Sequence, residues 1–136
     1  MRMMMTLFFG ALLMMSIATS AVAKPHLRTV KSINDGLLAV GIADKIRKSC
    51  PSISARMFRA LSFMNALENK AVAMGYTSAE IKAYVKSPNE KAKMRARGEA
   101  YLASKGVVKS DPESYCAQGR IEIANKSQIG ALLRAK

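Results

Sequence analysis

Three capping motifs in the second half of the chain constrain its fold more than any other feature. They occupy residues 77–80, 87–90 and 110–113. Each combines a short hydroxyl or carboxyl side chain with a glutamate, a pattern that satisfies the free N–H groups at a helix start. The second and third motifs also place a proline where the first helical residue is expected. The motifs predict three helices, of which the middle one runs to about Lys105 and is ended by Gly106.

Two more helices are predicted upstream of these motifs. The first covers about residues 33–49 and ends before Pro51, because the residue that precedes a proline resists the helical conformation. It is apolar on nearly all sides, which is typical of a helix in the middle of a bundle. Its two glycines, Gly36 and Gly41, would let neighbouring elements approach closely.

The second upstream helix starts near Ser52 or Ser54 and ends at Met74, with Gly75 as a left-handed cap. Its apolar residues fall on one stripe of helical period. The stripe comprises Met57, Ala60, Leu61, Met64, Leu67, Ala71 and Met74. We interpret this stripe as core rather than as a flexible, methionine-rich binding groove.

These patterns together predict an all-α domain over residues 33–136, a compact bundle of about five helices. No strand-like alternation with hairpin turns is present in the sequence. A last apolar cluster, formed by Ile129, Leu132 and Leu133, is expected to dock as a short turn. Residues 24–32 are expected to form a flexible leader.

Residues 1–23 have the features of a cleaved signal peptide. A positive start at Arg2 precedes an uncharged apolar stretch, and Ala21 and Ala23 form the small-residue site that a signal peptidase accepts. We therefore expect cleavage before Lys24 and a periplasmic location. The alternative is an uncleaved anchor, because the apolar stretch is long enough to span a bilayer. No second apolar run of that length follows, so no transmembrane segment is expected after cleavage.

The two cysteines, Cys50 and Cys116, are expected to form one disulfide bond. An even pair in an oxidising compartment usually becomes a bridge. Closing a loop of about 67 residues would restrict the unfolded chain by roughly 4 kcal/mol. A reactive thiol or a metal site is the alternative, but the chain has no C-x-x-C motif and no histidine near either cysteine.

Several segments resemble a small exported family of alphaproteobacterial proteins whose function is unknown. They read INDGLLAVGIAD at 33–44, CPSISAR at 50–56, KMRARG at 93–98 and DPESYC at 111–116. The resemblance covers most of residues 33–136. It implies a Gram-negative periplasmic setting, and it carries no activity, ligand or catalytic residue.

The sequence offers little chemistry for catalysis. Its single histidine, His26, falls in the expected leader, and Pro25 lacks the N–H that an N-terminal copper or nickel site requires. The common hydrolase, zinc-protease and nucleotide-binding motifs are missing from the sequence. We therefore expect no cofactor, no metal and no enzyme activity. The alternative is a small hydrolase that uses a dispersed pair of its nine carboxylates.

Positive charge is the most unusual feature of the composition, with a formal net charge of +13. One basic group lies on the predicted fourth helix and consists of Lys91, Lys93, Arg95 and Arg97. At about 100° per residue, Lys91 and Arg95 flank one side of the stripe formed by Met94, Gly98 and Tyr101, and the other two basic residues flank its other side. A second group surrounds the first cysteine and consists of Lys45, Arg47, Lys48, Arg56 and Arg59.

Three interpretations of these basic groups remain open. They attract a polyanion such as anionic lipid or lipopolysaccharide phosphate, or they only keep a small exported protein soluble. A third is that an arginine is partly buried and paired with Glu99 or Asp44. Nucleic acid fits poorly, because export is expected and no recognised binding motif is present. Elsewhere, Asp44 with Lys48 and Glu122 with Lys126 have the favourable order for i, i+4 ion pairs.

The sequence thus predicts a non-enzymatic, disulfide-bonded periplasmic domain that acts by binding. Its partner would be an anionic component of the envelope, a periplasmic protein or an unfolded client. The candidate anion-binding residues are Lys91, Lys93, Arg95 and Arg97.

Overall fold

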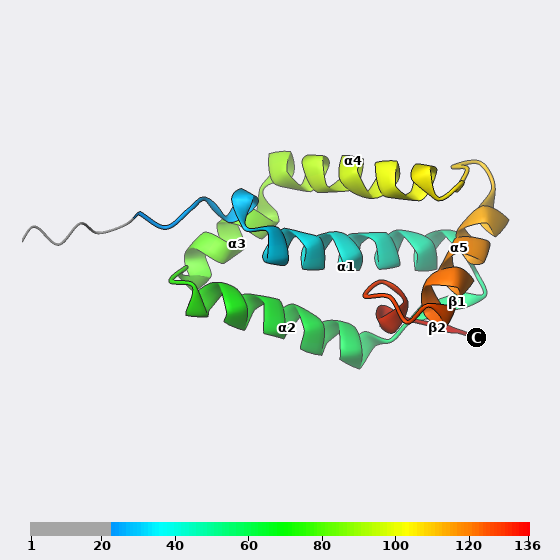
Figure 1. The fold of residues 1–136 in the computed structure, drawn as a ribbon, viewed down its shortest axis with the longest axis horizontal. Helices are drawn as coiled ribbons and strands as arrows, with labels where there is room; N and C mark the ends of the chain where they lie inside the picture. Colours follow the sequence, from blue (N-terminus) through cyan, green and yellow to red (C-terminus); the bar gives the residue numbers. More distant parts are fainter. Residues whose placement is uncertain (1–22) are drawn as a thin grey trace, which may run out of the picture.

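Residues 23–136 form five α-helices, two short strands and two 3₁₀ turns in the computed structural model (Figure 1). The elements are η1 (Leu27–Thr29), α1 (Lys31–Ser49), β1 (Ile53–Ala55), α2 (Met57–Ala73), α3 (Ser78–Lys86), α4 (Pro88–Ser104), α5 (Pro112–Ala124), η2 (Gly130–Leu132) and β2 (Leu133–Ala135). The all-α class with five helices is confirmed. The expected signal peptide lies outside the described residues except for Ala23, so its cleavage stays a prediction. Within residues 23–136, no helix is both long and apolar enough to cross a membrane.

Helix α1 is the central element, as its apolar character predicted. It packs against α4, α5, α2 and β1, and Figure 1 shows α4 and α2 on opposite sides of it. Ile42, Ala43 and Ile46 on this helix are buried in the main core. A β-carbon at Gly36 would approach the Leu67 side chain to 2.6 Å, so this glycine allows α2 to pack closely, as expected.

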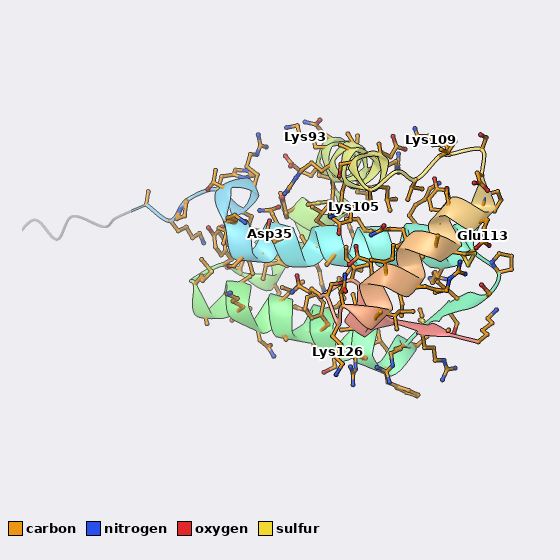
Figure 2. All side chains as sticks on the ribbon, turned by 45° about the vertical axis from the view of Figure 1, so that its right-hand side comes forward. Asp35, Lys93, Lys105, Lys109, Glu113 and Lys126 are labelled. Atoms are coloured by element: carbon orange, nitrogen blue, oxygen red, sulfur yellow. A yellow bond between two sulfur atoms is a disulfide. The ribbon has the colours of Figure 1, made fainter. Side chains whose placement is uncertain are left out.

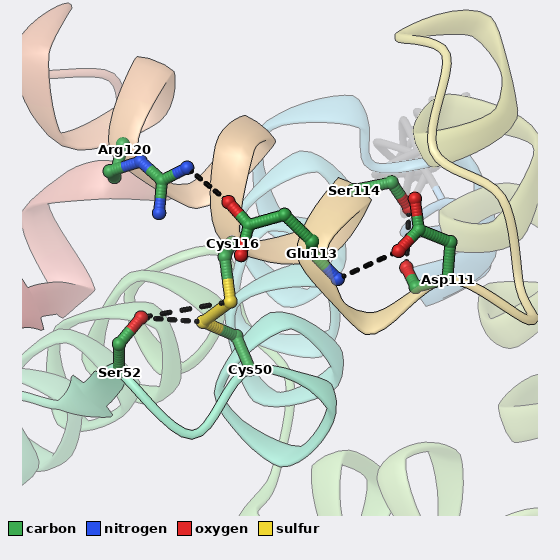
Figure 3. The surroundings of a disulfide bond; sticks show 7 residues. All are labelled: Cys50, Ser52, Asp111, Glu113, Ser114, Cys116 and Arg120. Atoms are coloured by element: carbon green, nitrogen blue, oxygen red, sulfur yellow. Dashed lines mark hydrogen bonds and ion pairs between the residues drawn. A yellow bond between two sulfur atoms is a disulfide. The ribbon is translucent and has the colours of Figure 1, made fainter.

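A disulfide bond joins the end of α1 to the first half of α5, which confirms the predicted bridge. The Cα atoms of Cys50 and Cys116 lie 5.1 Å apart, and both residues are buried. The Ser52 hydroxyl oxygen lies 3.2 Å from the Cys50 sulfur and 3.7 Å from the Cys116 sulfur (Figure 3). Burial keeps both sulfur atoms away from solvent thiols, which is typical of a structural bridge.

Two short antiparallel strands lie at the same end of the molecule and were not predicted. Strand β1 pairs with β2 so that Ala55 is opposite Leu133. Ile53 and Leu133 are buried, which anchors the ladder in the main core. A β-carbon at Gly119 would collide with the Ile53 side chain of β1 and approach Ile46 of α1 to 2.9 Å, so α5 crosses this region at close range. The expected terminal turn is therefore η2 followed by a strand.

Residues 24–32 are not the flexible leader that we expected. They contain η1, and α1 begins at Lys31 rather than at residue 33. Leu27 and Val30 are buried in a second core cluster, because they extend the apolar face of α1 backwards along the chain. The Tyr76 hydroxyl also donates a hydrogen bond to the Pro25 carbonyl. The leader is thus packed against the region where α2 ends.

Helix α2 buries less of its apolar stripe than predicted. Leu67 and Ala71 are buried, whereas Met57, Leu61 and Met74 are exposed. The helix also starts later than expected, because β1 occupies the residues before it. Interpreting the whole stripe as core was wrong, since an amphipathic pattern does not say whether a neighbour covers the apolar face.

The predicted capping motifs are confirmed at three helix starts. Thr77 and Glu80 form a reciprocal capping box at α3. Ser87 and Asp111 accept hydrogen bonds from backbone N–H groups in the first turns of α4 and α5. Gly75, which follows α2, has a φ of 96°, the left-handed conformation expected of a cap. These local signals set the helix boundaries that place the basic residues of α4.

Candidate anion-binding groove

The four basic residues singled out on α4 fall into two pairs with different surroundings. Lys91 and Arg95 line a groove between α1 and α4. Lys93 lies 3.8 Å from a glutamate of its own helix, and Arg97 lies 3.6 Å from Asp35 of α1. Figure 2 shows Lys93 on the side of α4 turned away from α1. The division follows the helical spacing predicted from the sequence, and it leaves only one pair in the groove.

The groove combines an apolar floor with a charged rim and has a volume of about 580 Å³. The floor consists of Leu38, Gly41, Ile42, Met94, Gly98 and Leu102. The rim consists of Asp44, Lys45, Lys48, Lys91, Arg95 and Glu99. Small-molecule sites occupy roughly 300–1,000 Å³ and combine apolar walls with a few polar groups. The groove fits that description in size and in composition.

Two glycines keep the floor of the groove open. No atom lies within 4 Å of the place where a β-carbon of Gly41 would stand, so the close approach predicted there is wrong. A β-carbon at Gly98 would lie 3.5 Å from Ile42 and 3.9 Å from Leu38. A side chain at Gly41 would therefore occupy free space above the floor.

Each of the two carboxylates at the rim forms an ion pair with at least one basic side chain. Asp44 is bonded to Arg47 at 2.5 Å and to Lys48 at 2.6 Å, and the second contact confirms the i, i+4 pair predicted from the sequence. Arg47 is exposed, so it is not the partly buried arginine of the third interpretation. Desolvation raises the pKa of Asp44, but the Lys48 hydrogen bond and the Arg47 charge outweigh it and leave that pKa below 3.8. Glu99 is bonded to Lys109 at 3.0 Å, which lowers the pKa of Glu99. Both carboxyls are thus held in their charged form.

Three basic side chains at the rim have no such partner. Within residues 23–136, Lys45, Lys91 and Arg95 make no ion pair within 4.0 Å. The Lys45 ammonium instead lies 5.8 Å from the centre of the Tyr115 ring. Cations that gather at an apolar, partly enclosed surface raise the positive potential there, which favours an anion in the groove.

The sequence interpretation missed that the second basic group contributes to this groove. Lys45 lies seven residues after Leu38 and three after Ile42, so all three share one face of α1. That spacing was the available signal, but its use required knowing that α1 and α4 are neighbours. Arg56 and Arg59, from the same group, lie elsewhere and line a hollow beside the start of α2.

A buried carboxylate lies outside the groove, at Glu122 on α5, which is 4% exposed. The Tyr101 hydroxyl donates to it at 2.5 Å, the Gln118 amide donates at 2.9 Å, and the Ser127 hydroxyl donates to its other oxygen. Desolvation raises the pKa of Glu122, but these three hydrogen bonds outweigh it and lower that pKa. Within residues 23–136, Glu122 does not form the expected surface ion pair with Lys126, because its side chain faces the interior.

His26 caps the turn η1 instead of lying in a disordered leader. Its Nδ1 atom accepts a hydrogen bond from the Arg28 backbone N–H at 3.2 Å, and its ring meets the Tyr84 ring edge-on. In the part of the chain that the structure describes, no three His, Cys, Asp or Glu side chains are placed to hold a metal ion together.

Residues 25–134 match a family of unknown function, DUF5333. The chain belongs to this family. The match includes most of residues 24–32, in agreement with their packing against the domain. It confirms the resemblance to a family of unknown function, whereas the alphaproteobacterial setting and export stay predictions. The chain matches no curated protein and no solved structure.

Proposed function

We propose that the protein is an exported, non-catalytic binding module that holds a small anionic molecule in the groove between α1 and α4. The ligand's apolar part would lie on the floor, against Ile42 and Met94, and its charge would lie at the rim. The observation that carries the proposal is the position of Lys45, Lys91 and Arg95, which make no ion pair within 4.0 Å in residues 23–136 and stand beside an open apolar floor.

The charge arrangement favours an anion that also has an apolar part. A simple inorganic ion would gain from the basic rim but would leave the floor in contact with water. An apolar ligand without charge would gain about 25 cal/mol per Å² of floor that it covers, but nothing from the cations. A molecule with both features uses the whole groove, in the way that small-molecule sites usually combine apolar walls with a few polar groups.

The carboxylates of the groove support binding over hydrolysis. A paired-carboxylate hydrolase needs one carboxyl with a raised pKa as its general acid. The pKa values of Asp44 and Glu99 are both lowered by basic neighbours, so neither carboxyl is suited to donate a proton near neutral pH. The buried disulfide bond supports export, because such bonds persist mainly in oxidising compartments.

Binding of anilinonaphthalene sulfonate tests the groove, because this probe joins an aromatic ring system to one negative charge. We expect the double variant Lys91→Gln with Arg95→Gln to weaken binding about tenfold, since each exposed charge interaction contributes up to about 1 kcal/mol. The matched control is Lys93→Gln with Arg97→Gln, which removes the same charge from the same helix. The control should change the dissociation constant less than twofold.

The outcome that contradicts the proposal is an equal loss of binding in both double variants, which would show that only net charge matters. A third variant, Gly41→Leu, should block the groove by filling the free space above its floor. Leucine also has a higher helix propensity than glycine, so α1 should remain folded. If Gly41→Leu binds the probe as well as the parent does, the probe lies elsewhere.

A further inference from the structure

A second surface, at the start of α2, exposes three large apolar side chains that no element of residues 23–136 covers. Met57 is 58% exposed, Phe58 is 91% exposed and Leu61 is 57% exposed. At about 100° per residue these three positions lie within one quarter to one third of the helix circumference. We call them the α2 patch. Single exposed apolar residues are normal on soluble proteins, but three adjacent ones indicate a contact surface.

Arginines surround the α2 patch. Arg56 directly precedes α2, Arg59 lies in its first turn and Arg134 comes from β2. All three line a hollow of about 740 Å³ that also contacts Phe58. Within residues 23–136, none of these three arginines makes an ion pair within 4.0 Å. The sequence has no acidic residue at 45–67 and none after residue 122. The charged side chains that line the hollow beside the α2 patch are therefore all positive.

The patch and its arginines are held in place by the strands. The Arg56 backbone N–H donates a hydrogen bond to the Leu132 carbonyl at 2.8 Å. Arg134 lies opposite Ser54 in the ladder, and its Nε donates to the Ser54 hydroxyl at 3.2 Å. The neighbouring Ile53 is buried in the main core. The start of α2 is thus a fixed surface and not a frayed helix end, so little conformational entropy is lost when it binds.

We propose that the α2 patch docks the protein onto an anionic lipid bilayer. Phe58, Met57 and Leu61 enter the interfacial region, and the three arginines bind lipid phosphates from the hollow beside them. Apolar side chains with a basic border are the signature of interfacial binding, and arginine binds phosphate with two parallel N–H donors. A second copy of this chain is a poorer occupant, because it would bring the same arginines against one another.

This docking surface is separate from the groove proposed above. Figure 1 shows α2 and α4 on opposite sides of α1, and the lining residues of the groove and of the hollow have no member in common. Docking through α2 therefore goes beyond ligand binding in the groove, and each can fail without the other.

Vesicle co-sedimentation tests the proposal with the full domain. The vesicles contain either phosphatidylcholine alone or an equal mixture of phosphatidylcholine and phosphatidylglycerol. Because a basic residue near an anionic surface contributes about fivefold in affinity, Arg56→Gln with Arg59→Gln should weaken binding to the mixed vesicles about 25-fold. Phe58→Ser with Leu61→Ser should weaken it at least tenfold, through the lost apolar contact. Higher salt should weaken binding of the parent.

Two controls match these variants. Val72→Ser removes an apolar side chain that is 48% exposed near the other end of α2, and Lys93→Gln with Arg97→Gln removes two positive charges from α4. Both controls should bind within about twofold of the parent. Circular dichroism must show that all variants remain folded, which their exposed positions favour.

Three outcomes would overturn the proposal. The first is equal binding to neutral and mixed vesicles. The second is equal weakening by Arg56→Gln with Arg59→Gln and by the charge control on α4, which would reduce the effect to net charge. The third is a concentration-dependent dimer in light scattering that Phe58→Ser abolishes, because a second copy would then be the occupant of the α2 patch.

Discussion

Replacing Glu122 by glutamine should destabilise the junction between α4, α5 and the C-terminal segment. Tyr101 comes from α4, Gln118 comes from α5 and Ser127 precedes η2, and all three donate hydrogen bonds to this one buried carboxylate. Glutamine retains the shape and one carbonyl acceptor. It loses the negative charge, and its amide presents N–H donors to a group that itself donates.

The magnitude follows from the number and kind of these hydrogen bonds. A hydrogen bond to a charged acceptor contributes about 1.5–3 kcal/mol, against about 0.5–1.5 kcal/mol for a neutral one. Three bonds lose charge assistance in Glu122→Gln, but the substitution also removes the cost of burying a charge. The lowered pKa of Glu122 indicates that the bonds outweigh that cost. We expect a net loss of about 1–3 kcal/mol at neutral pH.

The pH dependence gives the prediction its sharpest form. The pKa of Glu122 is lower in the folded protein than its usual value of 4.5. Its charged form therefore contributes stability that is fully present above about pH 4.5 and is lost as the pH falls through the folded-state pKa. Glutamine does not titrate, so the difference in stability between the parent and the variant should shrink in acid.

Urea unfolding followed by far-ultraviolet circular dichroism at pH 7 and at about pH 3 measures this difference. The control is Glu113→Gln on the same helix, which removes an exposed pair with Arg120 (Figure 3) and should cost no more than about 1 kcal/mol. A Glu122→Gln variant as stable as the parent at pH 7, or a difference that does not shrink in acid, would refute the reasoning.

Two further predictions concern the core. Protein that is reduced while unfolded and then refolded in reductant should be roughly 4 kcal/mol less stable, because Cys50 and Cys116 are 66 residues apart. Urea unfolding measures this loss, and an unchanged midpoint would show that the bridge contributes nothing. Gly119→Ala should destabilise by about 1–3 kcal/mol through overpacking against Ile53 and Ile46, whereas Gly41→Ala should stabilise by about 0.5–1 kcal/mol. Thermal unfolding checks both glycine variants, and shifts of the same sign would contradict the packing described.

Local chemistry explains which parts of the fold could be predicted. The capping box of Thr77 and Glu80 lies within four residues, so the sequence alone reveals it. The pairing of Ala55 with Leu133 joins strands of three residues each that lie far apart in the chain, too short to show an alternating pattern. The packed leader was missed because Leu27 precedes the predicted start of the first helix at residue 33, and no side-chain cap marks the true start at Lys31.

The candidate site could be predicted only in part, for a related reason. Helical spacing separated Lys91 and Arg95 from the other two basic residues of α4, but it could not show what each pair faces. The pairing of Arg97 with Asp35 depends on how α4 packs against α1. The exposed start of α2 depends in the same way on which elements cover it, which no single-helix pattern contains.

The placement of the unpaired cations bears on whether the positive charge only keeps the protein soluble. Exposed carboxylates such as Asp35, Asp44 and Glu99 each neutralise a basic neighbour. Of the twelve basic residues that make no ion pair within residues 23–136, six stand beside the groove or the α2 patch, and the other six, which include Lys70 and Lys126, lie elsewhere. The six beside these two surfaces are Lys45, Lys91 and Arg95 at the groove, and Arg56, Arg59 and Arg134 at the α2 patch. A surface selected only for solubility gains nothing from free cations beside uncovered apolar side chains, whereas an amphipathic anion uses both.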